Sequence, residues 1–206
     1  VIKNCPRIAD VYLMQNLLQE LGCFVSWAGN TVTVNASHIH DRRISGESVT
    51  RMRSSVMLLG AALGRLGEAT MAYPGGCVIG RRPIDIHLSA LRKMGVEIEE
   101  QEQLFTAKAA KLRGEEIRLP FPSVGATENV ILAAVTAEGT TVLENAAREP
   151  EIEALCGFLA SAGAEIEGTG KDCLRIKGVE GLHDAKYEVP ADRIVAGTYL
   201  TAALAA

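Results

Sequence analysis

Residues 82–99, RPIDIHLSALRKMGVEIE, contain the pattern that decides the fold. Arg82 and Asp85 open the stretch, apolar residues recur at helical spacing, and Gly95 precedes an alternating segment at 96–99. A helix favours an acidic residue in its first turn and a glycine at its left-handed C-terminal position. The stretch therefore predicts a helix that is followed by a strand.

Two other segments, 7–26 and 148–167, have the same design. Each begins with arginine and places an acidic residue three positions later, at Asp10 and Glu151, and each contains a glycine that closes the helix. The closing glycines of the three segments are about seventy residues apart, which is the signature of an internal repeat.

Each repeat also has a second half made of strands and helices. Return strands of hairpins are predicted at 31–35, 104–108 and 173–177. Helices are predicted at 49–66, 128–137 and 194–206, and glycine-led strands follow the first two at 67–71 and 139–143. Each unit thus reads β-α-β-α-β-β, with the chain beginning inside one copy and ending inside another. We expect an α/β domain with pseudo-threefold symmetry, because a generic doubly wound sheet would not need paired strands after every second helix.

Composition excludes several classes of protein. The chain has 206 residues, 48% of them hydrophobic, which excludes a disordered chain, and its apolar runs are too short for a membrane span. A net charge of −4 provides no overall field that would attract nucleic acid. No secretory leader is visible, so we expect a cytoplasmic protein. The apolar stretch at 194–206 ends without a cap, which favours a fragment of a longer protein.

The segment 74–85, PGGCVIGRRPID, is the sharpest local feature. Three of its glycines lie between two prolines, so the backbone can adopt unusual angles around Cys77. Arg81, Arg82 and the expected helix start all favour the thiolate, and they would also attract a phosphate or carboxylate. We therefore predict that Cys77 is a functional thiol.

Other reactive side chains have simpler interpretations. Cys5, Cys23, Cys156 and Cys173 lie among apolar neighbours and are predicted to be packing residues. His87 lies at a helix start and is interpreted as structural, and the pair His38 and His40 as part of a polar loop. The glycine-rich 168–171 is expected to be a hairpin turn, because it lacks the full phosphate-loop motif.

The segment around Cys77 resembles the active-site loop of the UDP-N-acetylglucosamine 1-carboxyvinyltransferase (enolpyruvyl transferase) family, which catalyses the first committed step of peptidoglycan synthesis. The resemblance extends in order along nearly the whole chain. Its further motifs are TRMRSS at 50–55, FPSVGATEN at 121–129, EGTT at 138–141, ENAAREPEI at 144–152 and DRI at 192–194.

This resemblance implies a two-domain enzyme in which each domain is a threefold β-α-β-α-β-β assembly, an inside-out α/β barrel. It implies transfer of the enolpyruvyl group from phosphoenolpyruvate to the 3′-hydroxyl of UDP-N-acetylglucosamine, with release of phosphate and with no metal or organic cofactor. Cys77 would be the general acid and the residue alkylated by fosfomycin. The implied substrate-binding residues are Arg53, Arg82, Pro83, Ile84, Asp85, Ile86, Phe121, Pro122, Ser123 and Val124.

Two departures from the family pattern limit what this chain is expected to do. The family's lysine-asparagine pair that binds phosphoenolpyruvate would precede Val1, and its proposed general base would follow Ala206. We expect 1–191 to be the cysteine-bearing domain and 192–206 to begin a second domain, with little turnover from this chain alone. An exposed interdomain face would allow self-association. The alternatives are a non-catalytic nucleotide-sugar-binding protein and the shikimate-pathway enolpyruvyl transferase, against which the Gly-Gly-Cys loop argues.

Overall fold

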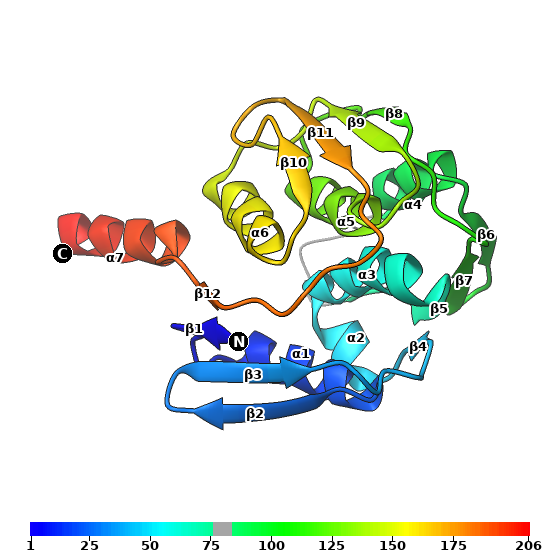
Figure 1. Ribbon diagram of the computed structural model, residues 1–206. Coiled ribbons are helices and arrows are strands. Elements are labelled where there is room, and N and C mark those ends of the chain that lie inside the picture. The colour runs from blue at the N-terminus through cyan, green and yellow to red at the C-terminus, as the bar shows by residue number, and fades with distance from the viewer. Residues whose placement is uncertain (76–83) are drawn as a thin grey trace.

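A computed structural model describes residues 1–75 and 84–206 of the chain. Figure 1 shows strands arranged in three separate sheets around a group of helices, with one further helix extending away from the body. Each sheet has four strands, and each belongs to one of the three units that the sequence predicts.

The elements follow the repeat along the chain. The first unit contains β1 (Ile2–Lys3), α1 (Ala9–Glu20), β2 (Phe24–Ala28) and β3 (Thr31–Asn35). The second contains β4 (Arg43–Ile44), α2 (Glu47–Arg51), the 3-10 helix η1 (Arg53–Val56), α3 (Met57–Leu66), β5 (Glu68–Ala72), α4 (Asp85–Lys93), β6 (Glu97–Glu100) and β7 (Leu104–Lys108). The third contains β8 (Glu116–Arg118), α5 (Val124–Ala134), β9 (Thr140–Glu144), α6 (Pro150–Ser161), β10 (Glu165–Glu167) and β11 (Cys173–Lys177). β12 (Tyr187–Glu188) and α7 (Arg193–Ala205) end the chain.

The three sheets share one topology. Their strand orders are β4-β5-β7-β6, β8-β9-β11-β10 and β12-β1-β3-β2, and the first pair of each is parallel. β12 therefore provides the first strand of the unit whose other strands lie at the opposite end of the chain. This arrangement confirms the pseudo-threefold repeat and its offset phase. The three predicted return strands also coincide with β3, β7 and β11.

Equivalent side chains build the buried face of two of the sheets. Met71 of β5 is paired with Phe105 of β7, and Leu143 of β9 with Leu174 of β11, and all four are fully buried. The three helices of the quoted motif end as predicted, because Gly22, Gly95 and Gly163 have φ values of 101°, 89° and 100°.

Two predicted helices have different bounds in the structure. The helix expected at 49–66 is interrupted at Met52, which is extended, so α2, η1 and α3 replace it. Buried Ser55 donates to the carbonyl of Met52 at 2.7 Å, and the N–H of Gly75 donates to the carbonyl of Val49 at 3.2 Å. Acceptors that a continuous helix would use are thus taken by other donors. This interruption places Arg53 in a short 3-10 helix rather than within a long α-helix.

Helix α5 begins four residues earlier than the predicted helix at 128–137. Ser123 is its N-cap, with a side-chain oxygen that accepts from the N–H of Ala126 at 3.4 Å. The segment 123–127, which the sequence places ahead of a helix, is therefore the cap and first turn of α5 itself. The helix is bounded by this cap rather than by its apolar periodicity.

Of the four cysteines predicted to be packing residues, Cys5, Cys23 and Cys156 are buried. Burial raises the pKa of all three thiols. The prediction for Cys173 is wrong, because this residue is exposed. It alternates with the buried Leu174 along β11, so its side chain lies on the outer face of the sheet.

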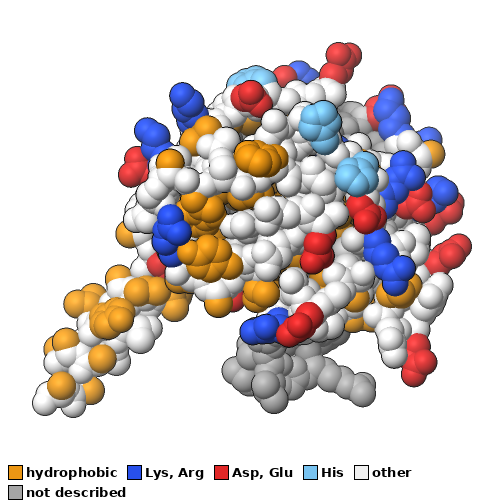
Figure 2. Space-filling view, turned by 90° about the horizontal axis from the view of Figure 1, so that it is seen from below, with side chains coloured by type: hydrophobic (Ala, Val, Ile, Leu, Met, Phe, Trp, Pro, Cys, Tyr) orange, Lys and Arg blue, Asp and Glu red, His pale blue; other side chains and the backbone are white. Residues whose placement is uncertain are grey.

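The C-terminal helix α7 extends away from the rest of the molecule (Figure 1), and its surface carries many hydrophobic side chains (Figure 2). Tyr199, Leu200 and Leu204 are 74%, 67% and 90% exposed. An ion pair of 3.1 Å between Arg193 and Glu151 joins the start of this helix to α6. The domain boundary expected at 191/192 coincides with this transition from packed to exposed chain and stays a prediction.

Helices α3 and α5 pack closely at the centre of the fold because α3 carries two glycines. A Cβ at Gly60 would collide with the main-chain and side-chain oxygens of Asn129, and one at Gly64 would lie 2.6 Å from Oγ1 of Thr136. In addition, the N–H of Gly60 donates to the side-chain oxygen of Asn129 at 2.7 Å. Any side chain at position 60 would therefore push the two helices apart.

We predict that Gly60→Ala lowers the free energy of unfolding by about 2 kcal/mol, because overpacking outweighs the better helix propensity of alanine. Urea unfolding should show a lower midpoint with an unchanged slope. Gly197→Ala is the matched control, since a Cβ at this helical position would have no neighbour within 4 Å. Equal midpoints for the two variants would contradict this account of the α3–α5 contact.

Glu128 on α5 gives the stability of the protein a pH dependence. Burial, and secondarily the charge of Glu151, raise the pKa of Glu128 from 4.5 to about 6. The folded protein therefore holds this proton more tightly than the unfolded chain does. The resulting stabilisation is complete below pH 4.5 and is lost as the pH rises through 6.

We expect Glu128→Gln to be more stable than the parent protein at pH 8, by on the order of 1 kcal/mol after allowance for partial solvent exposure. Urea midpoints measured from pH 4 to pH 8 should diverge between the two proteins as the pH rises. Glu20→Gln, at the exposed end of α1, serves as the control. A constant offset across the pH range would mean that Glu128 is not the source of the dependence.

Candidate functional site

The predicted site residues Cys77, Arg82 and Pro83 lie outside the residues that the structure describes. The residues that flank this segment are held in place by the fold. Gly75 is fixed by its hydrogen bond to α2, and a Cβ there would collide with the backbone of Thr50. Ile84 is 5% exposed and belongs to the core. The described residues on either side of 76–83 are therefore anchored at α2 and at the start of α4.

A cavity of about 260 Å³ lies between these two flanks. Three of its lining residues, Arg53, Ile84 and Asp85, were predicted as substrate-binding residues from distant parts of the sequence. The cavity thus brings together η1 and the first turn of α4. The other lining residues are Tyr73, Pro74, Leu88, Arg92 and Glu100.

The charges on one wall of this cavity are already paired with each other. Arg92 donates to Glu100 at 2.7 Å, and the hydroxyl of Tyr73 donates to the same carboxylate at 3.0 Å. These hydrogen bonds, chiefly the one from Arg92, lower the pKa of Glu100. The carboxylate therefore remains an acceptor for both neighbours.

A second group of predicted residues lies at the start of α5. Phe121 is 55% exposed, Pro122 is also exposed, and Ser123 and Val124 are half-buried. The side-chain oxygen of Ser123 accepts a hydrogen bond from the N–H of Ala126, and its carbonyl accepts one from the N–H of Thr127. Within the described part of the chain, the N–H groups of Val124 and Gly125 have no such acceptor. A helix start of this kind favours an anion.

The two groups are connected by His87, which lies on α4 and contacts the first turn of α5. A Cβ at Gly125 would lie 3.2 Å from Cε1 and 3.5 Å from Nε2 of this ring. Nδ1 of His87 is 3.1 Å from the side-chain nitrogen of Asn129. Burial, with a further contribution from the charge of Arg53, lowers the pKa of His87 to about 4, although Asp85 acts in the opposite direction. The ring is therefore uncharged at neutral pH.

Not every predicted residue lies at this site. Ile86 is half-buried and packs against the hydrophobic core rather than lining the cavity. The sequence interpretation assigned His87 only a structural role and did not single out Asn129, Tyr73, Arg92 or Glu100. One available signal was that Asn129 ends the matched motif at 121–129, whereas His87 lies just beyond the matched segment 74–85, between Ile86 and Leu88. Their mutual contact, 42 positions apart, is visible only in the fold.

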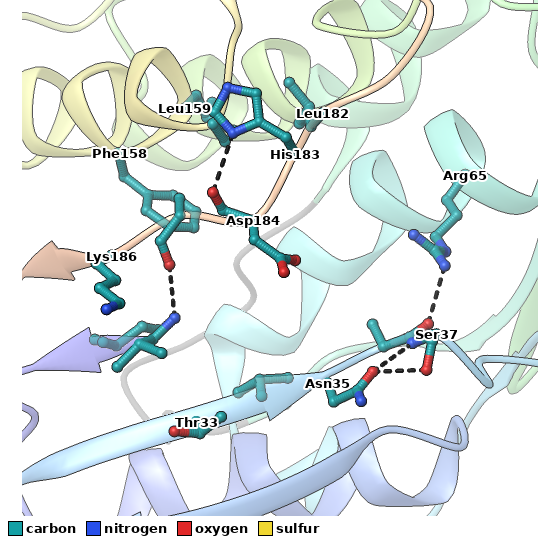
Figure 3. Close-up of a pocket in the computed structure, with 16 residues that line it drawn as sticks. Thr33, Asn35, Ser37, Arg65, Phe158, Leu159, Leu182, His183, Asp184 and Lys186 are labelled. Atoms are coloured by element: carbon teal, nitrogen blue, oxygen red, sulfur yellow. Dashed lines mark hydrogen bonds between the residues drawn. The ribbon is translucent and has the colours of Figure 1, made fainter.

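A larger hollow of about 960 Å³ lies elsewhere on the molecule, between the sheet of the first unit, the end of α6 and the segment before β12. Figure 3 shows Phe158, Leu159 and Leu182 on one side and the β3 residues Thr33 and Asn35 on the other. None of the predicted site residues that the structure describes lines this hollow. The larger hollow is therefore separate from the candidate site.

Within residues 1–75 and 84–206, no group of three or more histidine, cysteine, aspartate or glutamate side chains is placed to hold a metal ion. His38 and His40 are exposed and form part of a polar loop, as predicted, with Nδ1 of His40 lying 2.8 Å from the carbonyl of His38. The described helices also include none that is long and apolar enough to cross a membrane.

Comparison with known proteins gives a consistent picture. The family model described as EPSP synthase (3-phosphoshikimate 1-carboxyvinyltransferase) matches residues 1–206. A protein of Caldanaerobacter subterraneus subsp. tengcongensis, named UDP-N-acetylglucosamine 1-carboxyvinyltransferase 2, is 51% identical over 203 residues, which are 98% of this chain and 49% of that protein. The UDP-N-acetylglucosamine 1-carboxyvinyltransferase of Corynebacterium efficiens is 49% identical, with 98% and 48% covered. The chain thus spans about half the length of these relatives.

Solved structures with low sequence identity share the fold. The enolpyruvyl transferase NikO from Streptomyces tendae aligns with a TM-score of 0.83 at 24% identity, over 97% of this chain and 48% of that one. EPSP synthase from Acinetobacter baumannii aligns with a TM-score of 0.70 at 19% identity, over 97% and 46%. The repeated sheets, the match along the whole sequence and these structural similarities lead to one conclusion: this chain belongs to the EPSP synthase (3-phosphoshikimate 1-carboxyvinyltransferase) family.

Proposed function

We propose that the whole protein transfers the enolpyruvyl group of phosphoenolpyruvate to the 3′-hydroxyl of UDP-N-acetylglucosamine and releases phosphate. The main support is the agreement between two observations. Relatives that carry this activity in their name include one that is 51% identical to the chain. In addition, Arg53, Ile84 and Asp85, which the family resemblance implies as ligand contacts, line one cavity beside both ends of the segment that carries Cys77.

In this proposal, Cys77 is the general acid that protonates the enolpyruvyl methylene, and it is also the target of fosfomycin. A thiol suits this role because neighbouring positive charge can bring its pKa close to the working pH. Arg82 and Arg53 would bind anionic oxygens, for which the planar guanidinium group provides several donors at once. The contrast with the buried Cys5, Cys23 and Cys156 supports the choice of thiol, because burial raises the pKa of those three.

We infer that the nucleotide sugar binds at the starts of α4 and α5. Pro83, Ile84, Asp85 and Ile86 would contact it from one side, although Ile86 packs against the core and would act through the position of its backbone. On the other side, Phe121 and Pro122 are exposed and open to a ligand. Ser123 and Val124 would place the open N–H groups of α5 against the diphosphate.

The remaining expectations concern the whole protein. The chain spans about half of its relatives, so we propose that the rest of the active site belongs to a second domain and that this chain alone has little turnover. We expect the enzyme to act in the cytoplasm in peptidoglycan synthesis, and thereby in cell-wall biogenesis, cell shape and cell division. The apolar surface of α7 would face the second domain, and when left uncovered it would favour self-association.

The direct test is mass spectrometry of the whole protein after incubation with fosfomycin and UDP-N-acetylglucosamine. We predict one adduct, located on Cys77, and its complete absence in Cys77→Ser, because a serine hydroxyl is a far weaker nucleophile than a thiolate. Adduct formation on Cys77 would also distinguish this enzyme from the shikimate-pathway alternative.

The exposed Cys173 provides an internal control in the same spectrum. Equal labelling of Cys173 and Cys77 would indicate general thiol reactivity and contradict the proposal. An unlabelled Cys77 together with measurable binding of the nucleotide sugar would favour a non-catalytic binding protein instead.

A further inference from the structure

Asn129 lies at the point where the three central helices meet. Asn129 is fully buried. Its side-chain nitrogen donates to the carbonyl of Val56, the residue just before α3, at 3.0 Å. Its side-chain oxygen accepts from Gly60 of α3 at 2.7 Å. The same nitrogen lies 3.1 Å from Nδ1 of His87 on α4. Exchanging the amide oxygen and nitrogen would break both backbone hydrogen bonds, so the orientation of the amide is determined.

This orientation determines the tautomer of His87. An amide nitrogen can only donate, so Nδ1 of His87 must be the acceptor, and it must therefore be unprotonated. The proton of the neutral ring is then on Nε2. Asn129 thus selects one of the two neutral forms of the imidazole, and the low pKa of His87 agrees with a ring that stays neutral.

The edge of the His87 ring that carries Cε1 and Nε2 lies against the first turn of α5. This edge occupies the side of Gly125 where a side chain would otherwise be, and it would limit any Cβ there to a close contact. His87 is only 5% exposed, yet among the residues that the structure describes Nε2 has no hydrogen-bond partner. Of the described side chains, only Thr141 has a fully buried polar atom without a partner, so Nε2 of His87 is reached by solvent and its N–H is open to a ligand that provides an acceptor.

The surroundings of His87 are suited to an anionic acceptor. The N–H groups of Val124 and Gly125 are at the same helix start, and the charges of Arg53 and Asp85 both act on the ring. A neutral donor adds a hydrogen bond to an anion without adding a second positive charge next to Arg53 and the positive end of the helix dipole.

We propose that His87 donates its Nε2–H to an anionic oxygen bound against the first turn of α5, and that Asn129 is the positioning residue that keeps the proton on Nε2. Given the proposed function, this oxygen belongs to the diphosphate of the nucleotide sugar. Asn129 does not touch the ligand and acts only through His87.

The tautomer can be measured in this chain without any ligand. In long-range nitrogen–proton spectra of protein labelled with ¹⁵N-histidine, His87 should show a protonated Nε2 and an unprotonated Nδ1. The rings of His38, His40 and His183 in the same spectrum provide the reference. Asn129→Ala removes the donor to Nδ1 and should allow the other neutral tautomer to appear. A ring protonated on Nδ1 in the parent protein would overturn the proposal.

Two substitutions of His87 separate its two nitrogens. Glutamine can place an amide N–H near the position of Nε2, whereas asparagine retains only the acceptor that faces Asn129. In titrations with UDP, we expect the affinity of His87→Gln to lie within about threefold of that of the parent. The affinity of His87→Asn should be lower by about tenfold or more, because one hydrogen bond to a charged group is lost. Thermal unfolding of both variants identifies any loss that is due to misfolding.

The outcomes distinguish this proposal from the proposed function. If UDP-N-acetylglucosamine and UDP bind the parent protein but the two His87 variants bind equally well, the role of His87 is wrong and the proposed function stands. If folded parent protein binds neither ligand but does bind inorganic phosphate, with a shift of the Nε2 resonance, the anion site stands and the assignment of the nucleotide is wrong. Binding of none of the three ligands would overturn the ligand role of His87.

Discussion

The hydrogen bonds of the buried Asn129 amide are the constraint on which the rest of this structure depends. This one side chain of α5 bonds to the end of η1, to the first turn of α3 and to His87 of α4. Because this group is fully buried, losing any one partner would leave a polar atom without a hydrogen bond in an apolar interior. The relative positions of the three helix starts are therefore fixed, and with them those of Arg53, Asp85 and Ser123.

The fold is a threefold repeat, but the candidate site is not repeated. Helices α1, α4 and α6 occupy equivalent places in their units, and each has an acidic residue in its first turn. In α6 this residue, Glu151, pairs with Arg193, whereas Asp85 of α4 lines a cavity. Only α4 among these three has its start joined to that of α5 by a histidine–asparagine contact. The repeat thus places equivalent helices in each unit, and a few polar residues at one junction distinguish the candidate site.

The sequence predicts the repeat well because the repeat depends on local signals. Closing glycines such as Gly95 need a left-handed conformation, and return strands such as 173–177 show simple alternation. Helix boundaries are predicted less well where side chains compete with the backbone. Ser55 interrupts one predicted helix, and Ser123 starts another four residues early. The burial of Cys173 is predicted wrongly because apolar neighbours in the sequence do not share its face of the strand. Its neighbour Leu174 is on the opposite, buried face.

The candidate site is only partly predictable because it depends on contacts between units. Family resemblance selects Arg53, Asp85 and Ser123, and the fold brings the first two to one cavity and the third to the neighbouring helix start. The link between His87 and Asn129 is absent from any local pattern, because it joins residues of two different units. Conversely, family resemblance can select a residue that does not line the cavity. Ile86 belongs to the matched stretch but packs against the core.

The central claim is that the starts of α4 and α5 form one binding site. The most direct measurement is the change in backbone amide resonances of this chain on addition of UDP-N-acetylglucosamine. The account predicts that the largest changes occur together at Asp85, Val124 and Gly125. Changes concentrated instead at the residues around the larger hollow of Figure 3, such as Asn35 and Phe158, would contradict it.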